Sequence, residues 1–471
     1  MYKVKKNFFY QSLYQMLLII LPFVTAPYMS RVLGSEGVGI YSYSSSVTGY
    51  FSLVIMLGIN IYGNREVARL RTDKKRLEQF FSNIISLHIL IGCLCVIIYV
   101  LFITIFVNEN RLIFVIQLLT LLSSIFDINW FFFGMEEFKV TVTRNITVKL
   151  VSVAAIFILV NTNKDVWIYT LIMCVGTFLG QIILWGQLRK HICFVKPDLR
   201  EAITYIEPMF LLFIPSIAVS IYKQMDKVML GTMSSYSETG IYEYAEKIIN
   251  APIGLITAMG TVMLPAMSNL YANGEKDSAL STIQSSMKFM MFLSWGCLAG
   301  LLAVLQDFIP FFFGEDFREC VGVAYVLAFT IPFVAWANVL RTQFLLPVGK
   351  DKAYLYSLFC GAVINLFINF TLIPKIGAKG AAFGTLITEV SICVIQSIVT
   401  CKDLQMLRYI GDSFAFLVSA VVMLICVKCI SHVGIENTVI MILGEIIFGM
   451  AIYALINVKY ICYLLKGHQS D

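Results

Sequence analysis

Long apolar runs, separated by short polar connections, fill this chain from end to end. By length, about fourteen of these runs can cross a bilayer as helices. The pattern therefore predicts an all-α integral membrane protein. The predicted transmembrane helices are 8–30, 38–62, 80–107, 112–133, 141–160, 166–188, 209–231, 240–265, 283–306, 319–340, 353–373, 380–400, 413–430 and 437–459.

A short pattern occurs twice, first from Arg31 to Tyr43 and again from Lys227 to Tyr244. Each copy has a basic residue, a Leu-Gly pair, a polar turn and a Gly-Ile-Tyr-x-Tyr segment that opens an apolar run. Duplicated helix hairpins around a central site are the usual build of secondary transporters. The pattern favours a two-lobed carrier, although chance similarity of turn residues remains the alternative.

The repeat also predicts how the chain is divided. Two six-helix lobes of equal orientation would be related by a pseudo-twofold axis along the membrane normal. The segment between them, with Lys196-Pro197-Asp198 before a mixed apolar and polar stretch, is typical of a helix at the membrane interface. We expect an N-terminal lobe at 1–190, a cytoplasmic interfacial linker at 191–208, a C-terminal lobe at 209–402 and two additional helices in 403–471.

Composition and charge narrow the class and the orientation. With 59% hydrophobic and 14% charged residues, and a mean hydropathy of +0.81, the chain is not a soluble globular protein. Lys and Arg concentrate in alternate connections, which predicts a multi-pass protein of the cytoplasmic membrane with both termini in the cytoplasm. The basic segment from Arg69 to Arg76 fits anionic lipid headgroups better than nucleic acid. The 12 cysteines lack metal-ligand spacing, so we expect no metal site.

Ionisable residues inside apolar runs are costly and are therefore candidates for function. Lys223, Asp226 and Lys227 share one helix face, and Arg31 takes the position of Lys227 in the first copy of the repeat. The same spacing recurs after the turn at Glu243, Glu246 and Lys247. Pairing within each set, Asp226 with Lys223 and Glu243 with Lys247, is the structural alternative. The candidate substrate-binding residues are Arg31, Lys223, Asp226, Lys227 and Lys247.

Three further carboxylates stand in apolar runs: Asp127, Glu389 and Glu445. A carboxylate at this depth can hold a cation or exchange a proton, so Asp127 and Glu389 are candidate ion-coupling residues. A hydrogen-bonded structural acid is the alternative for each. The sequence has no phosphate-binding glycine loop and no Ser-His-Asp set that can be placed, so we expect neither an enzyme nor a cofactor.

Four segments resemble a known family. They are Pro27 to Gly39, Asp127-Ile128-Asn129-Trp130 with Gly134, Gln224-Met225-Asp226-Lys227 with the second repeat, and Asn369 to Ala382. In this order they resemble bacterial polysaccharide flippases of the Wzx type, in the multidrug/oligosaccharidyl-lipid/polysaccharide exporter superfamily. The resemblance covers nearly the whole chain.

The resemblance implies a function as well as a fold. Such flippases move undecaprenyl-diphosphate-linked oligosaccharide repeat units from the inner to the outer leaflet, for capsule, O-antigen or exopolysaccharide assembly. It implies alternating access, membrane lipids around the protein, a proton or sodium ion as a possible coupling partner, and work beside a polymerase and glycosyltransferases. One alternative is a multidrug or other amphiphile exporter of the same superfamily. Another is a membrane glycosyltransferase or polymerase, against which the repeat and the short loops argue.

Overall fold

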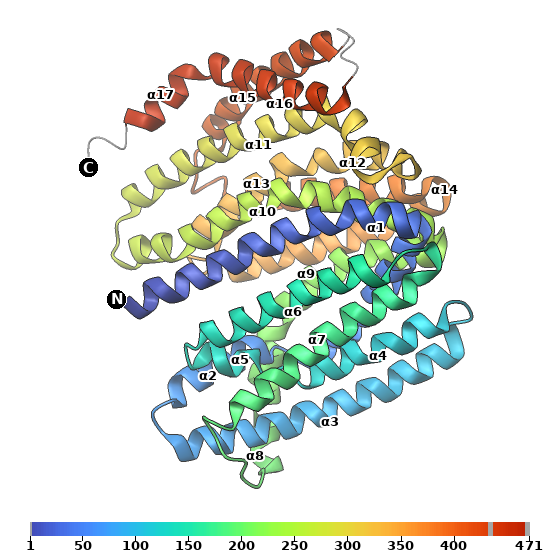
Figure 1. Cartoon of the computed structure of the whole chain (residues 1–471). Coiled ribbons are helices and arrows are strands. Elements are labelled where there is room, and N and C mark those ends of the chain that lie inside the picture. Colours follow the sequence, from blue (N-terminus) through green and yellow to red (C-terminus); the bar gives the residue numbers. More distant parts are fainter. Residues whose placement is uncertain (1, 432–436, 467–471) are drawn as a thin grey trace. The chain divides into compact units, whose positions relative to one another are not determined.

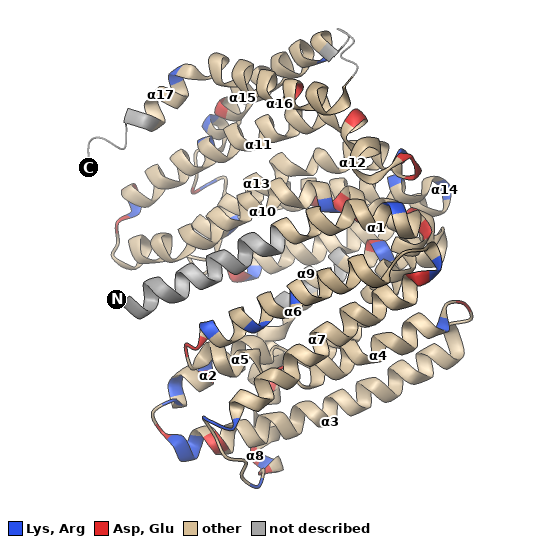
Figure 2. Ribbon diagram, in the orientation of Figure 1, with Lys and Arg blue, Asp and Glu red and all other residues tan. Residues whose placement is uncertain are grey.

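The computed structural model describes residues 2–431 and 437–466, and every regular element among them is helical (Figure 1). Eleven segments of this described part are long and apolar enough to cross a membrane. Most charged residues gather near the ends of the long helices, and few lie in the middles (Figure 2). The predicted class, an all-α integral membrane protein, is therefore confirmed.

The fourteen predicted runs all fall within helices, but several are interrupted. A break at Gly34, where φ is 65°, divides α1 (Tyr2–Met56) into the first run and the start of the second. The second run breaks again at Leu57–Gly58, before α2 (Ile59–Leu70). The fourth run was expected to be continuous, and this is wrong: it breaks between α4 (Arg111–Ile125) and α5 (Asn129–Gly134).

The chain forms two compact units, Met1–Gly240 and Ile241–Asp471. In the first unit, α4, α6 and α7 run side by side, and α3 packs on α4 (Figure 1). A core of buried aromatic and aliphatic side chains surrounds Trp130, which stacks on Phe81 at 5.5 Å. The remaining helices of this unit are α3 (Lys74–Phe106), α6 (Phe138–Leu159), α7 (Val166–Leu188), α8 (Leu199–Thr204) and α9 (Ile206–Met233).

The predicted linker region contains the short helix α8, which starts after its cap Asp198 as the Pro-Asp signal suggested. The segment before it is bonded to α3: Asn83 Oδ1 accepts from the Asp198 amide at 2.7 Å, and Asn83 Nδ2 donates to Glu201 at 2.9 Å. Glu78 accepts from the Cys193 amide at 3.0 Å. The unit boundary at Gly240 reflects the packing of α9 on α1. The lobe boundaries, which are defined by symmetry, stay a prediction.

In the second unit, α11 packs against α13, α15 and α16, and α14 folds back on itself (Figure 1). The break in α14 lies at Ile376–Gly377, between the two runs predicted there. Gln396 Nε2 donates to Ser357 Oγ at 3.0 Å, so the two arms are antiparallel. The helices are α10 (Tyr236–Ala272, beginning in the first unit), α11 (Lys276–Phe313), α12 (Cys320–Ala328), α13 (Thr330–Leu340), α14 (Asp351–Thr400), α15 (Met406–Ser431), α16 (Thr438–Ile456) and α17 (Val458–Lys466).

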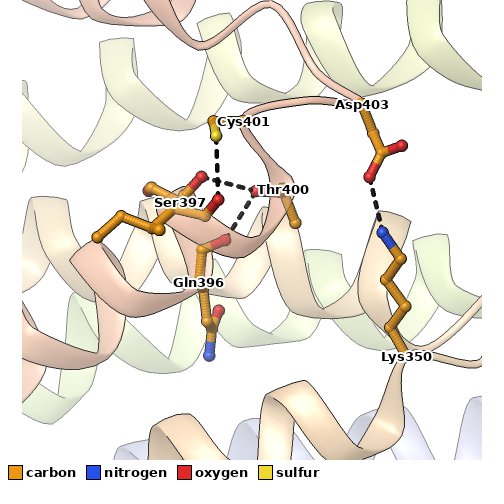
Figure 3. Close-up of polar contacts among 7 residues, drawn as sticks. Lys350, Gln396, Ser397, Thr400, Cys401 and Asp403 are labelled. Atoms are coloured by element: carbon orange, nitrogen blue, oxygen red, sulfur yellow. Dashed lines mark hydrogen bonds and ion pairs between the residues drawn. The ribbon is translucent and has the colours of Figure 1, made fainter.

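Polar contacts fasten the end of the α14 hairpin (Figure 3). Lys350 Nζ lies 2.7 Å from Asp403 Oδ2 and joins the connection before α14 to the one after it. Thr400 Oγ1 donates to the Gln396 carbonyl at 2.8 Å. The two C-terminal helices outside the predicted duplication are attached to α11, where Tyr453 of α16 donates to the Phe292 carbonyl at 2.8 Å.

Candidate functional site

Inside the first unit, the first copy of the repeated pattern packs against the part of the second copy that ends at Gly240. Ser35 Oγ and Ser237 Oγ are hydrogen-bonded at 2.7 Å. A Cβ on Gly39 would overlap the Tyr236 carbonyl and lie 3.0 Å from the Gly240 nitrogen. A Cβ on Gly240 would overlap the Ser35 carbonyl and lie 3.0 Å from the Gly39 nitrogen. Only glycine allows the two backbones to approach this closely.

This contact is reciprocal. Gly39 and Gly240 hold equivalent places in the two copies, and each glycine faces the residue four positions before the other. A twofold axis between two copies of a segment produces such self-complementary contacts. The turn regions of both copies therefore lie side by side in the first unit. Superposition of the complete lobes remains a prediction.

The polar face of α9 is turned towards α1. Asp226 is buried at 2% exposure, with the Tyr50 hydroxyl of α1 within electrostatic reach. Gln224 packs against Gly49 of α1. Its Oε1 is buried and has no hydrogen-bond partner among the described residues. Lys227 is half-buried, and the side chain of Lys223 lies outside the described residues. The sequence argument missed Gln224, although it stands between two selected residues.

Lys247 begins a second group, within the second unit. Its Nζ lies 3.2 Å from Glu243 Oε1 and 4.5 Å from the centroid of the Tyr244 ring. The predicted Glu243–Lys247 pair is thus confirmed. Tyr244 stacks on Phe313 and Phe317 at 4.7 and 4.9 Å, which fixes the ring below the ammonium group. The lysine side chain keeps 36% exposure, so it can still reach a ligand.

Arg31 is exposed and lies one turn before the break in α1. Its Nη1 donates to the Pro27 carbonyl at 3.0 Å, which holds the guanidinium group along its own helix. An exposed arginine at a helix end serves as an interfacial anchor and also attracts anions. The geometry is compatible with both interpretations of the sequence.

Asp127 occupies the break between α4 and α5. Its Oδ1 accepts from the Asn129 amide at 2.8 Å and from Asn129 Nδ2 at 2.7 Å. Arg144 Nη2 donates to Asn129 Oδ1 at 2.6 Å, and the Trp130 indole donates to the Asp127 carbonyl at 3.0 Å. These bonds satisfy backbone groups that the helix break leaves open, which favours the structural alternative for Asp127.

Glu389 is half-buried on the second arm of the α14 hairpin. The first arm carries two buried amides, Asn365 and Asn369, and Asn369 Nδ2 donates to Asn365 Oδ1 at 3.1 Å. Tyr242 and Thr385 share a hydrogen bond of 2.9 Å. The sequence argument looked for charges and missed these neutral groups, whose signal was the four-residue spacing of two amides in an apolar run.

The fold and these sites define a polytopic α-helical membrane protein with an internal repeat and charged groups on its repeat helices. Residues 4–271, more than half of the chain, match the family described as "Polysaccharide biosynthesis protein". The chain therefore belongs to this polysaccharide biosynthesis family. The predicted resemblance is confirmed.

Individual relatives and solved structures match larger parts of the chain. The chain is 25% identical over 404 residues to the "Putative O-antigen transporter" of Shigella dysenteriae. This alignment covers 83% of the chain and 99% of the relative. A solved structure titled "Lipid II flippase MurJ, inward closed conformation" matches this chain with a TM-score of 0.78 at 15% identity. The match covers 96% of this chain and 99% of the residues of that structure. An inward-facing multidrug resistance MATE transporter matches 84% of the chain and 98% of its own, with a TM-score of 0.59 at 12% identity. The two structural matches show the fold.

Proposed function

We propose that this protein is a flippase for undecaprenyl-diphosphate-linked oligosaccharide repeat units. It would carry them from the inner to the outer leaflet of the cytoplasmic membrane, without covalent change, with both of its termini in the cytoplasm. The observation that carries this proposal is the match to an O-antigen transporter along 99% of that relative's length. The membrane fold and the basic residues on the repeat helices support it.

Each unit carries basic residues that can attract the diphosphate. Arg31, Lys227 and Lys247 stand on the three helices that carry the repeated pattern, and each is at least partly exposed. Ammonium and guanidinium groups form charge-assisted hydrogen bonds with phosphate oxygens. The carboxylates Asp226 and Glu243 would limit the affinity so that the substrate can also leave.

The glycine contact suggests how one access path closes. Gly39 and Gly240 meet through backbone atoms, with one Ser–Ser hydrogen bond beside them. The Tyr43 ring of the first copy also packs against Gly231 and lies 5.6 Å from the Tyr236 ring of the second copy. We infer that the contact between the two copies belongs to a closed state and opens when the carrier exposes the substrate to the other membrane face.

The membrane potential favours outward movement of the substrate. A diphosphate that leaves a cell with a negative interior moves with the field, which contributes about 2.3 kcal/mol per charge per 100 mV. Movement of this kind needs no ATP. Coupling to a proton or sodium ion through Glu389 would add to this driving force.

A deletion experiment tests the proposed function. Cells without this protein should accumulate lipid-linked repeat units in the membrane and lose the surface polysaccharide, and expression of the intact chain should restore it. Mass spectrometry of the accumulated lipid would identify the oligosaccharide and show whether it belongs to capsule, O-antigen or exopolysaccharide. Normal surface polysaccharide without lipid accumulation would contradict the proposal.

Export of multidrug or other amphiphilic compounds is the second candidate, supported by the MATE-like fold. It predicts that deletion increases the uptake of dyes and drugs and leaves the surface polysaccharide unchanged. The same deleted strain therefore separates the two functions. A glycosyltransferase or polymerase would instead leave unfinished sugar chains, which the mass spectra would reveal.

A further inference from the structure

A pocket of about 520 Å³ lies in the second unit, where α15 and α16 pack beside α10 and α11. Its walls are mostly apolar and include two thioethers, Met423 and Met450, and a ring, Tyr453. Tyr453 stacks on Phe292, also in the wall, at 5.1 Å. The volume is within the range of sites for drug-sized molecules, and methionines adapt to ligands of different shape.

One carboxylate lies in this apolar wall. Glu445 is only 4% exposed, and neither of its oxygens has a hydrogen-bond partner within the described residues. Lys428 and Asp307 act on it electrostatically, with opposite signs. Lys428 directs its ammonium group to the Ala303 carbonyl at 2.8 Å. A buried carboxylate without donors is costly unless it takes up a proton or a positive group joins it.

We propose that this pocket binds an amphiphilic organic cation. The positive group would pair with Glu445, and the apolar body would lie against Phe292, Tyr453 and the two methionines. A ligand there contacts helices of the predicted lobe, α10 and α11, and both additional helices, α15 and α16. It would therefore fasten the additional helices to α11. The pocket lining includes none of the basic residues proposed to attract the diphosphate.

The walls favour an organic cation over a metal ion. A hard cation needs six or more oxygen ligands, or several waters. The pocket offers one carboxylate among carbon and sulfur atoms, and the described residues include no group of three His, Cys, Asp or Glu side chains arranged for a metal. An organic cation needs only the charge partner and the apolar surface, which are both present.

The charge is tested with two ions of the same shape and opposite sign. Purified protein in detergent should bind tetraphenylphosphonium saturably, at one ion per chain, and should not bind tetraphenylborate saturably. Glu445→Gln should weaken the binding of tetraphenylphosphonium at least about tenfold, because the buried charge partner is lost. Glu315→Gln is the control, since Glu315 is 70% exposed and paired with Arg318, and it should bind as the unmodified protein does.

The volume is tested at Gly300, in the pocket wall. A Cβ at this position would lie 3.6 Å from Met423 Cε, an ordinary contact, so Gly300→Ala should still bind the ion. Gly300→Leu should fill the pocket and abolish binding while Glu445 remains. In a variant that retains Cys297 as its single cysteine, tetraphenylphosphonium should slow alkylation of this pocket thiol.

Size-exclusion profiles establish that each variant is folded, and Gly300→Leu decides the test if Glu445→Gln does not fold. The proposal is overturned if either Glu445→Gln or Gly300→Leu binds tetraphenylphosphonium as tightly as the unmodified protein does. Equal binding of both tetraphenyl ions, or no saturable binding by the folded protein, also overturns it. Lipid flipping is measured separately, so failure of this site leaves the proposed function standing.

Discussion

Lys247 illustrates how a charged residue can be both paired and available. Glu243 and the Tyr244 ring hold its ammonium group from two sides, yet a third of the side chain is exposed. The predicted ion pair follows from a four-residue spacing on one helix, which sequence alone reveals. The stacking of Tyr244 on Phe313 and Phe317 joins segments that are far apart in the sequence. No local sequence pattern predicts it.

Replacement of Lys247 by Gln should slow flipping about tenfold, because a charge-assisted contact with the diphosphate is lost. Lys288→Gln is a matched control: Lys288 is also paired with a carboxylate, Asp412, lies over a ring, Tyr460, and has 38% exposure. Export of lipid-linked oligosaccharide is the measurement. Equal rates for both variants would show that Lys247 has only a structural role.

Glu389 is the residue proposed for ion coupling. If it carries a proton, flipping in reconstituted vesicles should change with an imposed pH gradient, and Glu389→Gln should remove that response. Glu315→Gln, at an exposed position, should respond as the unmodified protein does. Flipping that follows voltage alone, with the same rate in Glu389→Gln, would leave Glu389 a packing residue.

At the scale of elements, breaks in helices were harder to predict than the helices themselves. Apolar length predicted the fourteen runs, and a polar turn with glycine marked the break in α1. The sequence analysis did not predict the break between α4 and α5, because the hydropathy of 112–133 hardly changes there. What stops α4 is a set of bonds from Asp127 and Asn129, completed by Arg144 from α6, and this partner becomes visible only after folding.

Substitution of Gly39 by Ala should cost about 1–3 kcal/mol of stability, because the new methyl group overlaps the Tyr236 carbonyl and forces the backbones apart. Gly186→Ala is the control, since a Cβ at this helical position in the same unit meets nothing within 4 Å. Thermal unfolding of the purified variants measures the difference. An unchanged unfolding temperature for Gly39→Ala would contradict the close contact.

At the scale of the whole molecule, the repeated pattern predicts two lobes with α15 and α16 outside the duplication, and this division stays a prediction. The Ser35–Ser237 bond shows that the turns of the two copies meet within the first unit. The helices α15 and α16 pack on α11. Sequence could not say that the two copies touch, since the pattern fixes equivalence between segments and not their distance.

A cross-link at this contact should stop transport. With Ser35→Cys and Ser237→Cys in a background without other reactive cysteines, oxidation should form a disulfide, because the two hydroxyl oxygens are only 2.7 Å apart. Flipping should cease on oxidation and return after reduction, while either single variant stays active. Full activity of the cross-linked protein would show that the two turns need not separate.

The reciprocal glycine contact has an evolutionary consequence. If the repeat arose by duplication, a single glycine codon supplied both sides of this contact in a dimer of half-length ancestors, and each mutation changed both sides at once. In the present chain the two codons can vary separately, but the two positions meet at one place. The energetic effects of Gly39→Ala and Gly240→Ala should therefore not add, because the first methyl group already separates the backbones that the second would push apart.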